Sequence, residues 1–274
     1  MMIEISHVSY KYNGSRQEVF EDLNLTLQEN RIYGLLGKNG MGKTTLLYLL
    51  SGLLHAQEGS LLFDGMDVGK RMPEVLQETF LVPEEFELPS LSMREFVAIH
   101  RTFYPRFSED VLKDCLNAFE LPDEPNLKVL SMGQKKKVYM SMALASGTRL
   151  LLMDEPTNGL DIPSKSLFRK VIAQNMSEDR MLIISTHQVH DVESLLDHLL
   201  ILDQSRILLD QSVSEVTAHY SFGYRPLGTM DEGVLYAEPA LQGNAVITKR
   251  DPNEAETPLN LELLFNAMTK GVIQ

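Results

Sequence analysis

The chain has 274 residues, 43% of them hydrophobic, and a formal net charge of −13. These values are typical of a globular protein with one domain of moderate size and a small addition. The negative charge argues against a protein whose main task is to grip nucleic acid, because that task favours basic surfaces, so we expect no nucleic acid partner. The single cysteine, Cys115, excludes an internal disulfide, which favours a reducing compartment and a buried side chain.

The sequence contains no segment with the roughly 18–20 uninterrupted apolar residues that a membrane-spanning helix needs. Its N-terminus lacks the basic start and the apolar stretch of a signal peptide. We therefore expect a cytoplasmic chain that associates with a membrane only through a partner. The basic run Lys135-Lys136-Lys137 is interpreted as a solvated helix face rather than a binding site.

The start of the chain is predicted to form strands that lead into a glycine-rich loop. Residues 3–10 and 23–27 alternate apolar and polar side chains, as half-buried strands do, and Asn13-Gly14 is a turn signal between them. Residues 32–36 form a short apolar strand before the loop, and a helix is predicted for residues 45–54 directly after it.

From about residue 86 to residue 146 the pattern is helical, with Pro105 separating two helices, and buried strands then alternate with helices. Continuous apolar runs predict parallel strands that are buried on both faces. The core is therefore predicted to be α/β with a mostly parallel sheet. The predicted helices cover residues 92–103, 108–119, 164–175 and 190–196, and the predicted strands cover residues 150–153, 181–185 and 198–202.

The character of the chain changes after about residue 216. Glycine and proline crowd between residues 223 and 233, and two short strand-like runs follow at residues 234–237 and 245–248. A final helix is predicted for residues 259–268. The tail is therefore interpreted as a small separate module.

The pattern G-x-x-x-x-G-K-[ST] of a phosphate-binding loop lies between the predicted strand and the predicted helix. Its glycines let backbone N–H groups wrap phosphate oxygens, and the start of the helix adds its positive dipole end. Lys43 would reach the β- and γ-phosphates, and the Thr44 hydroxyl would bind Mg²⁺. The residues expected to bind nucleotide here are Gly37, Lys38, Asn39, Gly40, Met41, Gly42, Lys43, Thr44 and Thr45.

Two carboxylates, Asp154 and Glu155, follow a predicted buried strand. They would point out at the carboxyl edge of the sheet, where α/β proteins place ligands. Asp154 is expected to hold Mg²⁺, and Glu155 is expected to act as the general base for the attacking water. An apolar run before Asp-Glu is a weak signal alone, but the phosphate-binding loop upstream strengthens it.

The residues Leu130-Ser131-Met132-Gly133-Gln134 lie 23 positions before Asp154, counted from Ser131, and a helical stretch follows them. They resemble the L-S-G-G-Q signature of the ATP-binding cassette (ABC) family and depart from it only at Met132. The Ser131 hydroxyl and the Gly133 backbone would offer a second anion site at a helix start. In the family this loop contacts the ATP of a second subunit, so the resemblance implies that Ser131, Gly133 and Gln134 act in trans.

Further features of the ABC family follow in order. Asn158-Gly159-Leu160-Asp161 resembles the D-loop, and His187 resembles the switch histidine that contacts the γ-phosphate and the attacking water. Tyr12, 25 residues before Gly37, resembles the aromatic residue that stacks on adenine, with Tyr10 as the alternative. Glu84 occupies the place of the family's loop glutamine, which makes it a candidate Mg²⁺ ligand that adds a charge and lacks the amide donor.

The resemblance covers residues 1 to about 216. It implies a P-loop NTPase core with a mostly parallel sheet and an N-terminal antiparallel part. It also implies an inserted helical subdomain at about residues 86–146, and leaves a C-terminal α+β extension at residues 217–274. The implied activity is ATP hydrolysis, with ATP and Mg²⁺ bound between two chains, most simply a homodimer, that drive a separate membrane permease. Residues 105–107 and 261–266 look most like ATP-binding subunits of bacterial exporters.

The motifs also allow alternatives to a transport ATPase to be considered. A soluble ABC-type ATPase that remodels a protein assembly would carry identical motifs. A DNA-maintenance ATPase would need a long insertion, and only 86 residues separate Thr44 from Ser131. A kinase or GTPase would leave the signature unexplained. For the tail, a dimer brace is favoured over a regulatory or docking module.

Overall fold

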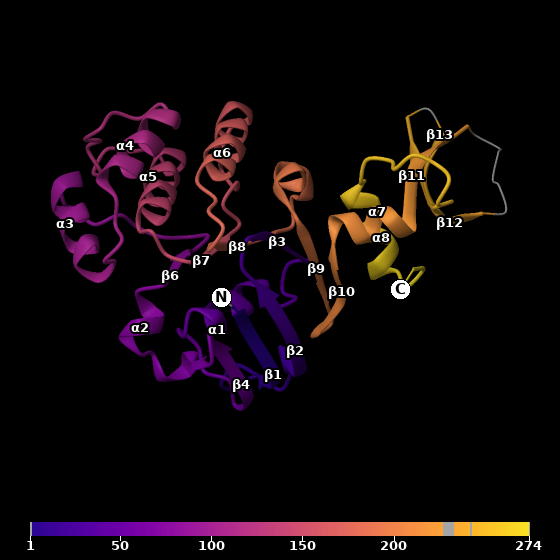
Figure 1. The fold of residues 1–274 in the computed structure, drawn as a ribbon, viewed down its shortest axis with the longest axis horizontal. Coiled ribbons are helices and arrows are strands. Elements are labelled where there is room, and N and C mark those ends of the chain that lie inside the picture. The colour runs from indigo at the N-terminus through magenta and orange to yellow at the C-terminus, as the bar shows by residue number, and fades with distance from the viewer. Residues whose placement is uncertain (1, 227–232, 242, 274) are drawn as a thin grey trace.

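The computed structural model describes residues 2–226, 233–241 and 243–273. The molecule is elongated in Figure 1, with a group of helices at one end, two sheets in the middle and a small α+β portion at the other end. No helix among the described residues is long and apolar enough to cross a membrane.

The central sheet has six strands in the order β10-β9-β3-β8-β7-β6. Neighbouring strands from β9 to β6 are parallel, and β10 is antiparallel to β9. Every residue of β7 and β8 is buried, as the continuous apolar runs predicted. The strands are β3 (Arg31–Leu36), β6 (Thr79–Val82), β7 (Leu150–Asp154), β8 (Met181–Thr186), β9 (His198–Asp203) and β10 (Arg206–Ser212).

A second sheet is antiparallel and lies beside the first (Figure 1). Helix α1 (Lys43–Leu50) lies between the two sheets, because its leucines join one hydrophobic cluster with residues of both. The helix ends before Gly52, whose φ of +68° requires the left-handed region. The strands are β1 (Met2–Tyr10), β2 (Phe20–Gln28), β4 (Glu58–Phe63) and β5 (Met66–Asp67).

The helical part contains α3 and α4, which begin within one residue of their expected positions. Serine side chains cap both helices: Ser92 accepts from the N–H of Glu95, and Ser108 accepts from the N–H of Val111. Cys115 is 1% exposed in α4, which confirms the prediction that it is buried. The helices before the tail are α2 (Pro73–Leu76), α3 (Met93–Phe103), α4 (Glu109–Ala118), α5 (Met132–Ala145) and α6 (Ile162–Gln174).

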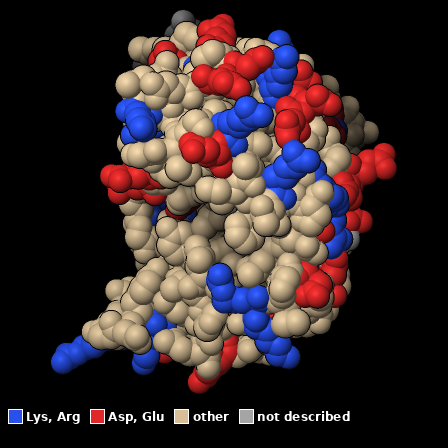
Figure 2. Space-filling model, turned by 90° about the vertical axis from the view of Figure 1, so that its left-hand side faces the viewer, with Lys and Arg blue, Asp and Glu red and all other residues tan. Residues whose placement is uncertain are grey.

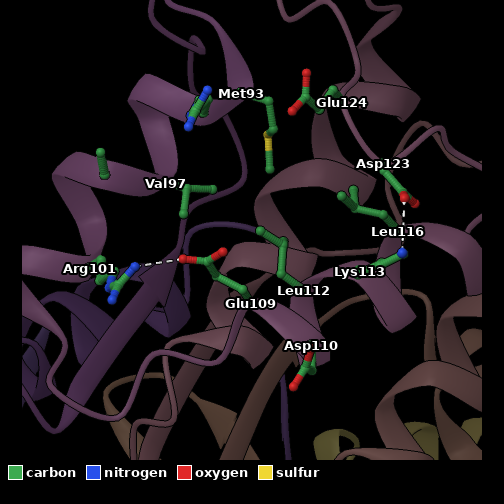
Figure 3. A pocket seen from close by; sticks show the side chains of 12 residues that line it. Met93, Val97, Arg101, Glu109, Asp110, Leu112, Lys113, Leu116, Asp123 and Glu124 are labelled. Carbon is green, nitrogen blue, oxygen red and sulfur yellow. Dashed lines mark hydrogen bonds and ion pairs between the residues drawn. The ribbon is translucent and has the colours of Figure 1, made fainter.

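A groove of about 680 Å³ separates α3 from α4 (Figure 3). Apolar side chains such as Val97 and Leu112 line it, and an ion pair of 2.7 Å between Arg101 and Glu109 joins the two helices. No residue expected at the nucleotide site lines this groove. The expected nucleotide-binding residues therefore lie outside this groove.

The tail forms a three-stranded antiparallel sheet and a final helix. It shares its core with the main body, because one hydrophobic cluster joins Ile247 and Leu264 to Val192 and Leu199. The division of the chain near residue 216 stays a prediction. The elements are α7 (Val213–His219), β11 (Tyr220–Arg225), β12 (Val234–Ala240), β13 (Gly243–Lys249) and α8 (Leu261–Thr269).

The helical stretch predicted at residues 190–196 is not one continuous helix. The segment forms two short 3₁₀ turns, Val189–Asp191 and Glu193–Leu195. Its buried side chains Val189, Val192 and Leu195 recur every three residues, which matches three residues per turn rather than 3.6.

Candidate nucleotide-binding site

The phosphate-binding loop joins the end of β3 to the start of α1. Gly42 has a φ of +99°, and a Cβ added there would lie 2.7 Å from a side-chain carbon of Val19. A Cβ on Gly37 would lie 2.7 Å from the carbonyl oxygen of Leu202. Both positions therefore require glycine, the first for its backbone conformation and both for lack of space.

Lys43 lies under this loop and is 7% exposed. Its Nζ donates to the carbonyl oxygen of Gly37 at 2.8 Å and lies 3.6 Å from Glu155 Oε1. The adjacent cavity has a volume of about 400 Å³. Its lining residues are Tyr12, Val19, Asn39, Gly40, Gly42, Lys43, Thr44, Thr45, Glu84 and Glu155.

Three of the nine loop residues predicted to bind nucleotide lie just outside this lining. Gly37 and Lys38 present their carbonyl oxygens to Lys43 Nζ, at 2.8 and 3.5 Å. Met41 packs against the hydrophobic cluster around α1. These three residues do not line the cavity, while the other six loop residues do.

Asp154 ends β7 and is 2% exposed. Its Oδ2 accepts from the Thr44 hydroxyl at 2.6 Å, and its Oδ1 accepts from the Ser185 hydroxyl. Carboxylate and hydroxyl oxygens are the hard ligands that Mg²⁺ prefers. The chemistry of this pair of side chains therefore fits a magnesium ion beside the phosphate-binding loop.

Glu155 has a φ of +43° and is 4% exposed. Its Oε2 accepts from the Thr186 hydroxyl at 3.0 Å, and its Oε1 accepts from the backbone N–H of His187 at 3.1 Å. The Nδ1 of the His187 ring lies 2.8 Å from the same Oε1. The structure thus brings the two predicted catalytic residues into direct contact, within reach of Lys43.

Glu84 lies in the loop after β6 and reaches the D-loop. Its Oε1 accepts from Asn158 Nδ2 at 2.8 Å, and Asn158 Oδ1 in turn accepts from Gln188 Nε2 at 2.9 Å. Three loops that follow neighbouring strands are therefore linked by amide and carboxylate groups at the carboxyl edge of the sheet.

The two candidate tyrosines differ in exposure. Tyr12 is 43% exposed, and its hydroxyl lies 3.0 Å from Thr45 Oγ1 at the edge of the cavity. Tyr10 is 7% exposed and meets the Tyr12 ring edge to face at 5.2 Å. Because the Tyr10 ring is enclosed by protein, this geometry favours Tyr12 for stacking on adenine.

The signature residues start α5, where Ser131 and Gln134 form a capping box. The Gln134 N–H donates to Ser131 Oγ at 3.3 Å, and the Ser131 N–H donates to Gln134 Oε1 at 3.0 Å. Met132 is 54% exposed, so the departure from the family pattern points to solvent. Gly133 lies beside the D-loop, where an added Cβ would be 3.5 Å from the carbonyl oxygen of Gly159. None of these residues lines the cavity at the phosphate-binding loop.

A family model described as ABC transporter matches residues 20–158, just over half of the chain. The chain belongs to the ABC transporter family.

Relatives of this ABC protein are ATP-binding subunits. ABC transporter ATP-binding protein YtrB of Bacillus subtilis (strain 168) is 29% identical over 80% of this chain and 75% of that protein. Nod factor export ATP-binding protein I of Burkholderia lata is 30% identical over 69% of this chain and 64% of that protein. A solved structure of the ATP binding subunit of an ABC transporter matches with a TM-score of 0.71 at 22% identity, over 79% of this chain and 92% of that one.

These similarities confirm the predicted family, fold and activity. The ABC protein is the ATP-binding, ATP-hydrolysing subunit of a transport system, with the P-loop NTPase fold.

Sequence reasoning missed several residues around the site of this ABC ATPase. Ser185 and Thr186, at the end of β8, hold the carboxylates of Asp154 and Glu155. They were visible only as the polar end of an apolar run. Lys136 is 3% exposed and donates to the carbonyl oxygen of Glu155 at 3.0 Å, so the interpretation of the lysine run as a solvated face is wrong for this residue.

Proposed function

We propose that two copies of the chain close around two ATP molecules and drive a separate membrane permease. One observation carries this proposal: each chain has one phosphate-binding loop and one signature loop, and the two do not meet within the chain. Exposed apolar residues surround the signature side, with Val129 75%, Met132 54% and Ile162 84% exposed. A second chain would cover these side chains, and two identical chains would supply both sites of a homodimer.

The phosphates of ATP fit the backbone N–H groups of the loop and the Lys43 ammonium group, and Tyr12 stacks on the adenine. Mg²⁺ fits Thr44 and Asp154, with Glu84 as a further ligand, and supplies neutralisation of the phosphate charge when bound.

In the proposed reaction, the oxygen of a water molecule forms a bond to the γ-phosphorus while the Glu155 carboxylate accepts a proton from that water. The bond from the γ-phosphorus to the bridging oxygen breaks, and ADP and phosphate are the products. His187 contacts the γ-phosphate and orients Glu155. Ser131, Gly133 and Gln134 of the second chain complete the site, so ATP favours the closed dimer and hydrolysis lets it open.

The permease is proposed to dock in an apolar hollow beside the helical part. This hollow has a volume of about 670 Å³ between α2, β6 and the end of α3. Figure 2 shows a hollow on this face, in a band of mostly uncharged residues between charged groups above and below. Phe103 and Leu53 at its edge are 65% and 55% exposed, so the hollow has exposed apolar side chains at its rim. Phe96, in contrast, is 4% exposed and packs in the hydrophobic core.

The direction of transport is proposed to be export, because one relative, which matches this chain over 194 residues, is named for Nod factor export. The chain is then a peripheral protein on the cytoplasmic face of the membrane, held there by the permease.

Affinity purification from native membranes in the presence of ATP tests the permease. We expect a polytopic membrane protein in stoichiometric amount with the parent chain, and its loss with Phe103→Asp. Tyr224→Asp provides the matched control, because Tyr224 is an equally exposed aromatic residue in β11, at 66%. Recovery of the chain alone or of soluble proteins would contradict the permease and favour a remodelling ATPase.

A further inference from the structure

Lys136 lies on α5, five positions after the signature serine, and its side chain is buried next to Glu155. A buried ammonium group is costly unless it is paired and hydrogen-bonded. Here Nζ donates to the backbone carbonyl oxygen of Glu155 at 3.0 Å. The reaction outlined above gives this group no task.

The carbonyl that Lys136 contacts belongs to a strained turn. Glu155 has a φ of +43° and precedes Pro156. Residues other than glycine rarely adopt a positive φ. Such a backbone persists only where surrounding groups fix it. The N–H of Glu155 donates to the Ser185 carbonyl at 3.0 Å, and its own carbonyl accepts from the N–H of Asn158 at 3.2 Å and from Lys136.

The charge of Lys136 also matters where it lies. Burial lowers the pKa of the Lys136 ammonium group from its usual value, and the carboxylates of Glu84, Glu155 and Asp154 oppose that shift. The same three carboxylates surround the proposed nucleotide site, where Lys43 is the other cation. A neutral residue at position 136 would remove one positive charge that offsets the negative charge of these three carboxylates.

We infer that Lys136 is a positioning residue for ATP hydrolysis: it holds the Glu155 carbonyl, and with it the left-handed turn that aims the Glu155 carboxylate at the attacking water. The inference rests on the general-base role proposed for Glu155. It assigns Lys136 no contact with ATP, so nucleotide binding should not depend on it.

Lys136→Met in the full chain removes the donor and the charge at similar side-chain length. We expect kcat to fall about tenfold or more, part of the 10²–10⁴-fold effect of a positioned general base, with KM and ATP affinity within about twofold of the parent. A merely structural role would lower the melting temperature and ATP affinity without this selective loss of kcat. Thermal melting and titration with ATP are therefore measured beside the steady-state kinetics.

Lys137→Met is the matched control. Lys137 also donates to a backbone carbonyl, that of Phe119 at 3.4 Å, but in the helical part away from Glu155. Its kcat should stay within about twofold of the parent. If Lys136→Met does not fold, Lys136→Leu replaces it, since the shorter apolar side chain also removes both the donor and the charge.

A kcat within about twofold of the parent in a folded Lys136 variant would overturn the inference, as would an equal loss of ATP affinity and kcat. Glu155→Gln is assayed in parallel to separate the two proposals. Full turnover in Glu155→Gln would show that Glu155 is not the general base. Loss of turnover in Glu155→Gln with normal turnover in Lys136→Met would contradict only the role of Lys136.

Discussion

Neighbouring groups hold the Glu155 carboxylate from several sides. Thr186 and the backbone N–H of His187 donate to it, and Lys43 Nζ lies 3.6 Å away. These groups fix the orientation of the carboxylate, and a general base must lie within hydrogen-bond reach of the proton that it accepts.

Motif residues at the site could be predicted because their chemistry is local in sequence. The loop from Gly37 to Thr44 carries its own glycines, lysine and hydroxyl. Partners from distant segments could not be predicted, because only the fold brings Asn158 to Glu84 across 74 positions. The buried state of Lys136 was hidden for the same reason: its neighbours on both sides are lysines, and the carbonyl it contacts lies 19 positions away.

Glu84→Gln tests the departure from the family pattern. Glutamine keeps a side-chain oxygen in place of the Oε1 that accepts from Asn158 Nδ2 at 2.8 Å, so this link should survive. We expect kcat/KM within about tenfold of the parent, or about 1.4 kcal/mol in activation free energy. Glu84→Ala, which removes the oxygen, should lose more. Complete inactivity of Glu84→Gln would show that the carboxylate charge itself is required.

Among the elements, those with strong periodic or continuous apolar patterns were predicted well. The continuous apolar runs of β7 and β8 predicted parallel strands that are buried on both faces, and every residue of the two strands is buried. Strand β12 extends to Ala240, past its predicted end, because it lies at the sheet edge where Pro239 is tolerated. Strand β11 was missed, since Gly223 interrupts a short pattern that pairs with β13 far along the chain.

Leu264→Ala tests whether the last helix belongs to the main core. Leu264 is 0% exposed and lies in the hydrophobic cluster that includes Val192 and Leu199. The substitution should lower the free energy of unfolding by about 2–5 kcal/mol, because it leaves a cavity there. Leu241→Ala is the control, as Leu241 is fully exposed in the same tail. Chemical denaturation followed by circular dichroism measures both, and equal stability of the two variants would contradict the shared core.

At the scale of the whole molecule, the phosphate-binding loop and the signature loop lie on two separate surfaces of the chain. The phosphate-binding loop opens beside Tyr12 and Glu155, while the signature loop starts α5 outside that cavity. In the proposed ATP-dependent dimer, the exposed Val129 and Ile162 near the second surface would contact the second chain.

The most direct test is the molecular mass of Glu155→Gln in solution, measured by light scattering with and without ATP and Mg²⁺. This variant should bind ATP but turn it over at least about a hundredfold more slowly, since the general base is lost. We predict that ATP converts it from the 31.0 kDa chain to a dimer of twice that mass. Adding Gly133→Asp, which places a charge and a side chain in the signature loop, should prevent the dimer. A Glu155→Gln chain that stays monomeric with ATP bound, or that retains full ATPase activity, would contradict the account.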